Sequence, residues 1–102
     1  MKVCTLASGS SGNSLYIEYG GTRILVDAGI SQRQMTQRLS VIGVSLSEID
    51  AVVVTHEHSD HTTALPRLGL PTYVASATAH LWKEKVARLT EFESDAPFTI
   101  KD

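Results

Sequence analysis

Residues 51–61 have the sequence AVVVTHEHSDH, in which a short apolar run leads directly into a cluster of metal-binding side-chain types. Three of the chain's four histidines and one aspartate fall within the six residues 56–61. Imidazole nitrogens and carboxylate oxygens are the ligands that hold zinc and similar transition metals in catalytic sites. Because the cluster follows a β-branched run typical of a buried strand, the pattern predicts an active-site metal centre.

The spacing divides these ligands into two pairs. In an extended segment, residues two apart point to the same side, so His56 and His58 can reach one ion together. Asp60 and His61 are adjacent, and a turn into a following helix can aim both at a second, nearby ion. Catalytic zinc needs about four ligands and keeps one position for water, so neither pair completes a site. The motif therefore indicates the first half of a two-metal centre, and a chance cluster of solvated polar residues is the weaker alternative.

Composition limits the remaining function classes. With 102 residues, 42% hydrophobic and 20% charged, the chain is predicted to form a single globular domain. A net charge of −2 gives no electrostatic argument for nucleic-acid binding, although a local basic groove stays open. The single cysteine, Cys4, is predicted to be a small buried side chain in a reducing compartment. Without a signal peptide or an apolar run near the ~18 residues of a membrane span, we expect a cytoplasmic protein with no membrane partner.

The first half of the chain has clear signals for strands and one helix. Apolar segments predict strands at 2–7, 15–19, 22–26 and 51–54, and Gly20-Gly21 predicts a hairpin between the second and third. Ser31 is predicted to cap a helix with Met35, Leu39 and Ile42 on its apolar face and Gly43 at its end. The spacing of Ser45 and Glu48 is that of a capping box for a short helical turn.

The second half is predicted to continue the alternation of helices and strands. A short helix is expected near His61, a strand at 70–74, a helix over 77–89 and a further strand from Pro97. The helix over 77–89 is expected because Ala79, Trp82, Val86 and Leu89 form one apolar stripe. The order β-β-β-α-β-α-β-α-β predicts a mixed α/β fold with hairpins at the front.

The motif His56-x-His58-x-Asp60-His61 after a buried strand resembles the signature of the metallo-β-lactamase superfamily. The loop SGSSGNS at 8–14, the hairpin and the segment LVDAG at 25–29 are most similar to the WalJ/YycJ-like subfamily of bacterial exonuclease-type phosphodiesterases. The resemblance covers the whole chain but about half of a family domain. It implies that residues 1–102 form a single partial domain, the N-terminal half of an αβ/βα sandwich, with a mixed sheet, hairpins and flanking helices.

The resemblance also implies roles for individual residues. His56 and His58 would bind the first metal, and Asp60 and His61 the second, with Asp60 expected to be essential for catalysis. Asp27 would orient the ligands without binding metal, and a simple strand-end cap is the alternative for it. The expected cofactor is Zn²⁺, up to two ions in a complete site, with Mn²⁺ or Fe as alternatives.

The family's later ligands are not found in this sequence. The remaining histidine, His80, falls on the predicted helix and is expected to have a surface or packing role. The predicted strand that includes Phe98 resembles the one leading to the family's third histidine, which is not reached. Ala64 stands where the family commonly has glycine.

The activity implied by the resemblance is hydrolysis of a phosphodiester, nucleic acid or another, by a metal-bridged hydroxide. The loop residues Ser10, Ser11, Gly12 and Asn13 could contact a phosphate, and an ordinary flexible connection is the alternative. The superfamily also hydrolyses thioesters, lactones and β-lactams, so the substrate rests on the subfamily resemblance. The segment Thr36-Gln37-Arg38 and the basic residues Lys83, Lys85 and Arg88 could contact nucleic acid, but such charges are expected mainly on solvated helix faces.

The second hypothesis is a truncated, catalytically incomplete module. Such a chain would bind metal weakly, or would need a partner chain, such as a second copy, to pair with its unfinished sheet. We expect little phosphodiesterase turnover from the isolated 102 residues.

Overall fold

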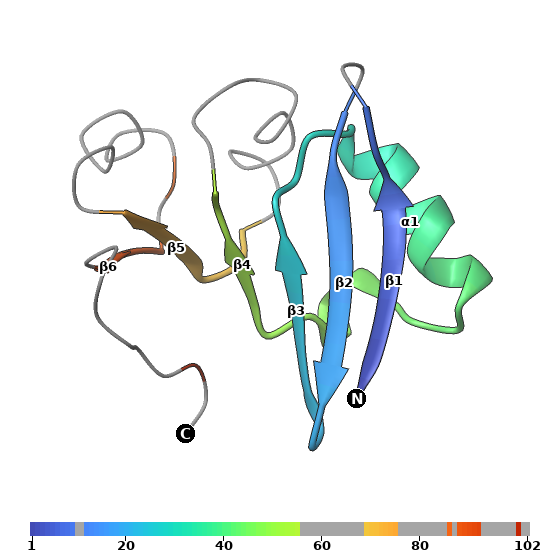
Figure 1. Cartoon of the computed structure of the whole chain (residues 1–102), viewed down its shortest axis with the longest axis horizontal. Helices are drawn as coiled ribbons and strands as arrows, with labels where there is room; N and C mark the ends of the chain where they lie inside the picture. The colour runs from blue at the N-terminus through green and yellow to red at the C-terminus, as the bar shows by residue number, and fades with distance from the viewer. Residues whose placement is uncertain (10–11, 56–68, 76–85, 87, 93–99, 101–102) are drawn as a thin grey trace.

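A computed structural model describes residues 1–9, 12–55, 69–75, 86, 88–92 and 100 of the chain. Within these residues six strands form one sheet, in which each strand lies beside its neighbours in sequence (Figure 1). They are β1 (Lys2–Ala7), β2 (Ser14–Tyr19), β3 (Thr22–Val26), β4 (Ala51–Val53), β5 (Thr72–Ala75) and β6 (Leu89–Phe92). The pairs β1–β2 and β2–β3 are antiparallel, and β3, β4, β5 and β6 are parallel. The predicted mixed α/β class, with hairpins at the front, is confirmed.

The hairpin between β2 and β3 turns on Gly20 and Gly21, as predicted. Their φ angles of 56° and 84° lie in the left-handed region, where a residue without Cβ is favoured. Pairs such as Tyr19↔Thr22 and Ile17↔Ile24 set the register. This register decides which side chains of the two strands share a face, because alternate residues point to opposite sides of the sheet.

Helix α1 (Gln32–Val41) begins where the sequence predicts. Ser31 accepts a hydrogen bond from the backbone of Gln34, whose side chain accepts one from the Ser31 N–H, so a complete capping box starts the helix. Met35 and Leu39 are fully buried. The prediction for Ile42 was wrong, since it is the C-terminal cap and 38% exposed. The chain has already left the helix there, so helical spacing no longer decides which way the side chain points.

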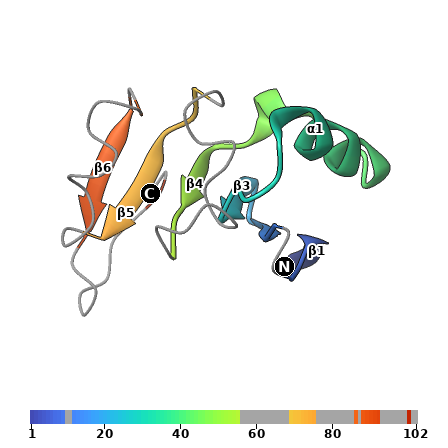
Figure 2. The same ribbon diagram turned by 90° about the horizontal axis from the view of Figure 1, so that it is seen from above.

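Helix α1 covers one face of the sheet (Figure 2). On that face Tyr16, Leu25 and Val52 lie side by side on β2, β3 and β4, and each is 1% exposed or less. A 3-10 turn, η1 (Leu46–Glu48), follows the helix and leads into β4, and its capping box of Ser45 and Glu48 is present as predicted. Alternating apolar residues on the strands and the buried stripe of α1 therefore build one core.

Among the residues described after β5, Leu89 differs from the prediction. Leu89, expected at the end of a helix over 77–89, begins strand β6, which pairs in parallel with β5. The Thr72 N–H also donates to the Arg88 carbonyl oxygen at 2.7 Å. Helical spacing of a few apolar residues could not reveal this, because the strand is selected by backbone pairing with a distant segment. Of the strand predicted at 98–101 only Ile100 is described, and it is not in a strand.

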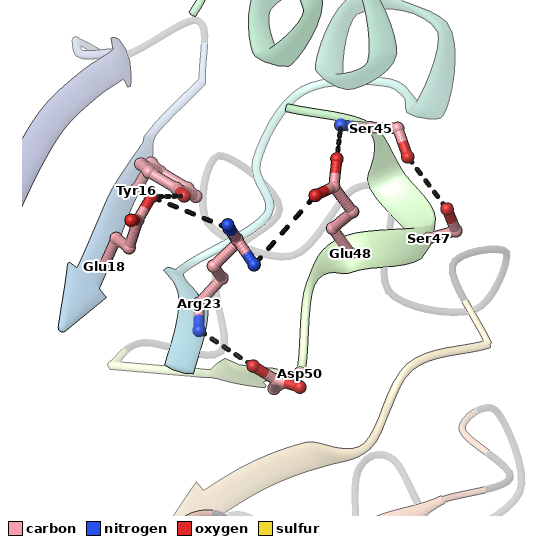
Figure 3. A network of polar contacts seen from close by, with 7 residues as sticks. All are labelled: Tyr16, Glu18, Arg23, Ser45, Ser47, Glu48 and Asp50. Carbon is pink, nitrogen blue, oxygen red and sulfur yellow. Dashed lines mark hydrogen bonds and ion pairs between the residues drawn. The ribbon is translucent and has the colours of Figure 1, made fainter. Parts of the chain in front are cut away.

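A polar cluster ties the hairpin to the turn before β4 (Figure 3). The Tyr16 hydroxyl donates to the Glu18 carboxylate at 2.6 Å, and Arg23 forms ion pairs with Glu18 at 3.6 Å and Glu48 at 3.9 Å. The backbone N–H of Arg23 also donates to the Asp50 carboxylate at 2.8 Å. These contacts lie at the end of the sheet where β3 and β4 begin.

The sheet face opposite α1 carries an open apolar groove of about 470 Å³. It is lined by Ile17, Tyr19, Thr22, Ile24, Val26, Val53 and Ile100. Tyr19 is 71% exposed. Across the described segments, no helix has the length and apolar character needed to cross a membrane.

Candidate metal centre

Asp27, the described residue of the predicted site, lies at the edge of the sheet where parallel strands β3 and β4 both end. Val26 pairs with Val53, so Asp27 follows β3 next to the place where the chain leaves β4 toward Thr55 and the histidine cluster. The side chains that follow parallel strands at their carboxyl ends converge at one edge, where open α/β sheets commonly bind ligands. Segments 28 residues apart in the sequence thereby meet.

Asp27 bonds to Thr55, the residue just before the histidine cluster. One carboxylate oxygen, Oδ1, accepts the Thr55 backbone N–H at 2.7 Å, and Oδ2 accepts the Thr55 hydroxyl at 2.6 Å. The Asp27 N–H donates to the Val53 carbonyl oxygen at 2.8 Å. The carboxylate therefore accepts from both hydrogen-bond donors of the residue that directly precedes His56.

The backbone of Asp27 has an uncommon conformation. Its φ of 67° places it in the left-handed region, and it is the only non-glycine residue with a positive φ among those described. Aspartate tolerates this region better than most residues, because its short polar side chain can bond locally. The side chain is 6% exposed. The turn after β3 thus directs a buried carboxylate at the end of β4.

The serine- and glycine-rich loop between β1 and β2 packs against this turn. The Ser14 hydroxyl donates to the Asp27 carbonyl oxygen at 2.8 Å, and the Gly29 N–H donates to the Asn13 carbonyl oxygen at 2.8 Å. A Cβ on Gly12 would lie 2.8 Å from the Gly29 oxygen. The loop is therefore in direct backbone contact with the segment that carries Asp27.

The Asn13 side chain closes the loop on itself. Its Nδ2 donates to the Gly9 carbonyl oxygen at 2.8 Å, and its Oδ1 accepts the Gly9 N–H at 3.2 Å. Both ends of this amide are thus engaged by the loop backbone. A role for Asn13 in shaping the loop follows directly from these contacts.

The structure therefore describes part of the predicted site. Asp27, Gly12 and Asn13 lie together at the carboxyl end of β3, while His56, His58, Asp60, His61, Ser10 and Ser11 lie outside the described residues, as does His80. In the part of the chain that is described, no three His, Cys, Asp or Glu side chains gather into a metal-binding group. The donor types of the cluster suit zinc, and the strand that leads to them ends beside Asp27.

Sequence reasoning missed Ser14 and Thr55. Both carry hydroxyls that bond to Asp27, at separations of 13 and 28 residues. Ser14 ends the Ser/Gly loop and Thr55 directly precedes the histidine cluster. These positions in the sequence could have indicated that both residues lie near the site. The partner of each hydroxyl follows only from strand pairing.

Among the described residues, the largest pKa shift lies in the polar cluster of Figure 3, away from Asp27. Burial and the hydrogen bond to Glu18 raise the pKa of Tyr16 to about 12. The same hydrogen bond lowers the pKa of the Glu18 carboxyl. Because these groups join the hairpin to η1 at the opposite end of the strands, they are assigned to the stability of the sheet.

Known proteins share the sequence pattern and the fold of this chain. The sequence pattern of the Metallo-beta-lactamase superfamily matches residues 7–98. Among solved structures, a B3 metallo-beta-lactamase with an active site glutamic acid superposes with a TM-score of 0.80, over 96% of this chain and 45% of that chain, at 16% identity. At that identity the likeness concerns the fold.

Two curated bacterial proteins are similar in sequence. Exodeoxyribonuclease WalJ of Streptococcus pneumoniae is 50% identical over 60 residues, which are 59% of this chain and 22% of that protein. Exodeoxyribonuclease YycJ of Bacillus anthracis is 38% identical over 77 residues, which are 72% of this chain and 29% of that protein. The chain thus spans less than a third of the length of these relatives.

Proposed function

Because the chain belongs to the metallo-beta-lactamase superfamily, we propose that it forms part of a metal-dependent hydrolase that acts on phosphodiester bonds of nucleic acid. One observation carries the proposal. The histidine cluster begins directly after Thr55, whose backbone N–H and hydroxyl are both held by the Asp27 carboxylate. This arrangement supplies a rigid start for a ligand-bearing segment, as a catalytic metal requires.

In this proposal the chain's own residues bind and orient the metal. His56 and His58 hold one ion and Asp60 and His61 a second, and Asp27 fixes the entry of the segment through Thr55. Zn²⁺ is the expected ion, and Mn²⁺ or Fe are alternatives with compatible nitrogen and oxygen ligands. When bound, such ions activate water and neutralise charge on a phosphoryl group. The cluster provides four ligands, so we expect the rest of a two-metal site to lie outside these 102 residues.

Two observations favour nucleic acid as the substrate. The curated relatives WalJ and YycJ are exodeoxyribonucleases. In addition, the start of β2, where Ser14 bonds to Asp27, lies at the same end of the sheet as the end of β3 (Figure 1). A loop of small residues can bring backbone N–H groups close to a phosphate. We therefore propose DNA as the first substrate to test, with Ser10, Ser11 and Gly12 beside the phosphate and Asn13 shaping the loop.

Metal binding is the decisive test of the proposal. The purified chain would be stripped with chelator and titrated with Zn²⁺ alone, and bound metal would be measured by equilibrium dialysis with elemental analysis. We expect binding that is weakened at least about 10-fold by His56→Ala or Asp60→Ala, because each removes a direct ligand. His80→Ala is the matched control and should bind like the unchanged chain. Equal binding by all four proteins would refute the proposal.

Hydrolysis is the second test. With Zn²⁺ or Mn²⁺ present, we expect the isolated chain to degrade end-labelled DNA slowly or below detection, because four ligands fill only part of a two-metal site. Rapid degradation that Asp60→Ala abolishes would contradict the incomplete-site part of the proposal. It would indicate that neighbouring copies of the chain complete the ligands.

A second candidate is a module that becomes competent only when another copy of the chain covers its sheet. The groove opposite α1 favours it, because Tyr19, Ile24 and Val53 line an open apolar surface. Sedimentation equilibrium would test it. A dimer that becomes monomeric on Ile24→Lys, while Zn²⁺ binding per chain falls in parallel, would support this candidate, and a monomer that binds Zn²⁺ would exclude it.

A further inference from the structure

Ser14 is a buried hydroxyl that the proposed chemistry does not use. It is the first residue of β2, is 3% exposed, and donates to the Asp27 carbonyl oxygen at 2.8 Å. Its oxygen also lies 3.7 Å from Met35 Sδ of helix α1. The hydroxyl therefore lies between helix α1 and the turn after β3, and its shorter contact is the hydrogen bond to the turn.

The bonded carbonyl belongs to Asp27, which among the described residues is the one non-glycine residue with a positive φ. Asp27 keeps a φ of 67°, and the direction of its carboxylate depends on the orientation of the peptide that follows it. The Ser14 hydroxyl bonds to the carbonyl of that peptide, and the Gly29 N–H holds the next peptide by donating to the Asn13 carbonyl. A buried carbonyl that loses its donor is driven to rotate toward another one.

We propose that Ser14 is a positioning residue for the metal-binding segment and acts through Asp27. The Ser14 hydroxyl donates to the Asp27 carbonyl and so holds the peptide that follows Asp27. The Asp27 carboxylate accepts from the N–H and the hydroxyl of Thr55. Thr55 directly precedes the segment that carries His56. This inference rests on the metal centre proposed above. Ser14, at the end of the loop, would then position metal ligands and need not contact the substrate.

The test compares Zn²⁺ affinity and local backbone protection in matched variants. Ser14→Ala removes the hydroxyl, and Ser14→Cys keeps the number of side-chain atoms but donates weakly. We expect the dissociation constant for Zn²⁺ to rise about 10-fold in Ser14→Ala, the lower end of the range for groups that orient ligands, and less in Ser14→Cys. Tyr16→Phe, which loses a hydrogen bond at the other end of β2, should lower stability without changing the affinity.

A thermodynamic cycle separates positioning from general loosening. If Ser14 acts through the carboxylate, Ser14→Ala should not weaken Zn²⁺ binding further once Asp27→Gly has removed that carboxylate. Equal weakening in both backgrounds would overturn the proposed path. Unchanged Zn²⁺ affinity in Ser14→Ala, with the unmodified chain binding normally, would overturn the inference while leaving the metal centre intact.

Hydrogen exchange gives a readout that does not depend on metal. The Thr55 amide donates to Asp27 Oδ1, so its exchange in the metal-free chain should speed up about 10-fold in Ser14→Ala relative to Tyr16→Phe. An unchanged Thr55 exchange rate would overturn the inference even if the chain bound no metal. Failure of the unmodified chain to bind Zn²⁺ would instead refute the proposed function, together with the part of the inference that concerns metal.

Discussion

Replacing Asp27 should reveal how much stability the turn after β3 contributes. Asp27→Ala removes two short hydrogen bonds from Thr55 to a carboxylate. Hydrogen bonds to charged groups contribute about 1.5–3 kcal/mol each, and because Thr55 is exposed and can bond to water instead, the lower figure applies. An alanine at a φ of 67° adds roughly 1 kcal/mol. We therefore expect Asp27→Ala to lower the free energy of unfolding by about 4 kcal/mol.

Two further substitutions at the same position separate these contributions. Asp27→Gly loses the carboxylate but accepts the left-handed backbone, and it should be roughly 0.5–1 kcal/mol more stable than the alanine variant. Asp27→Asn tolerates the backbone and can still accept from the Thr55 N–H, so it should lose only about 1 kcal/mol. The expected order of stability is Asp, Asn, Gly, Ala.

Urea denaturation followed by circular dichroism measures the four unfolding free energies. A loss of about 4 kcal/mol is a large share of the 5–15 kcal/mol typical of small domains, so the midpoint should move clearly. Thr55→Val, which keeps the side-chain size but loses the hydroxyl, should reproduce part of the loss, and Thr55→Ser should not. The reasoning is refuted if Asp27→Ala is within 0.5 kcal/mol of the unchanged chain, or if Asp27→Asn is as unstable as Asp27→Ala.

Three other predictions concern packing, protonation and metal. Gly12→Ala should destabilise the chain by at least 1 kcal/mol in thermal unfolding, because the new Cβ would meet the Gly29 oxygen at 2.8 Å; a matched Gly9→Ala has open space around its Cβ and should lose less. Tyr16, with a pKa of about 12, holds its proton more tightly in the folded chain than in the unfolded chain, where the pKa is near 10. Its contribution to stability is therefore present below pH 10 and should be lost as the pH rises from 10 to 12, and a urea-midpoint titration in which Tyr16→Phe shows the same loss would contradict this. Zn²⁺ at 100 times its dissociation constant should raise the free energy of unfolding by about 2.7 kcal/mol, chelator should reverse the gain, and an unchanged melting temperature would argue against binding to the folded state.

Local sequence signals were sufficient for the front of the fold. The helix cap at Ser31, the hairpin at Gly20-Gly21 and the apolar strands of the front half are short-range features, and each lies where it was predicted to within a residue. Such features depend on backbone conformations and hydrogen bonds between residues close in the chain. The same signals placed Leu89 in a helix, and its parallel pairing with Thr72 on β5 makes it part of a strand.

The sequence by itself determined the family and the chemical types at the site. The order and spacing of His56, His58, Asp60 and His61 after an apolar run are local properties, and they are enough to predict a metal centre. Only the tertiary structure decided which residues contact the segment that leads to those ligands. Parallel pairing of β3 with β4 brings Asp27 to Thr55, and the β1–β2 loop brings Ser14 to Asp27. The physical reason is that a hydrogen bond joins groups a few ångströms apart, and the distance between residues so far apart in the chain is set by the sheet.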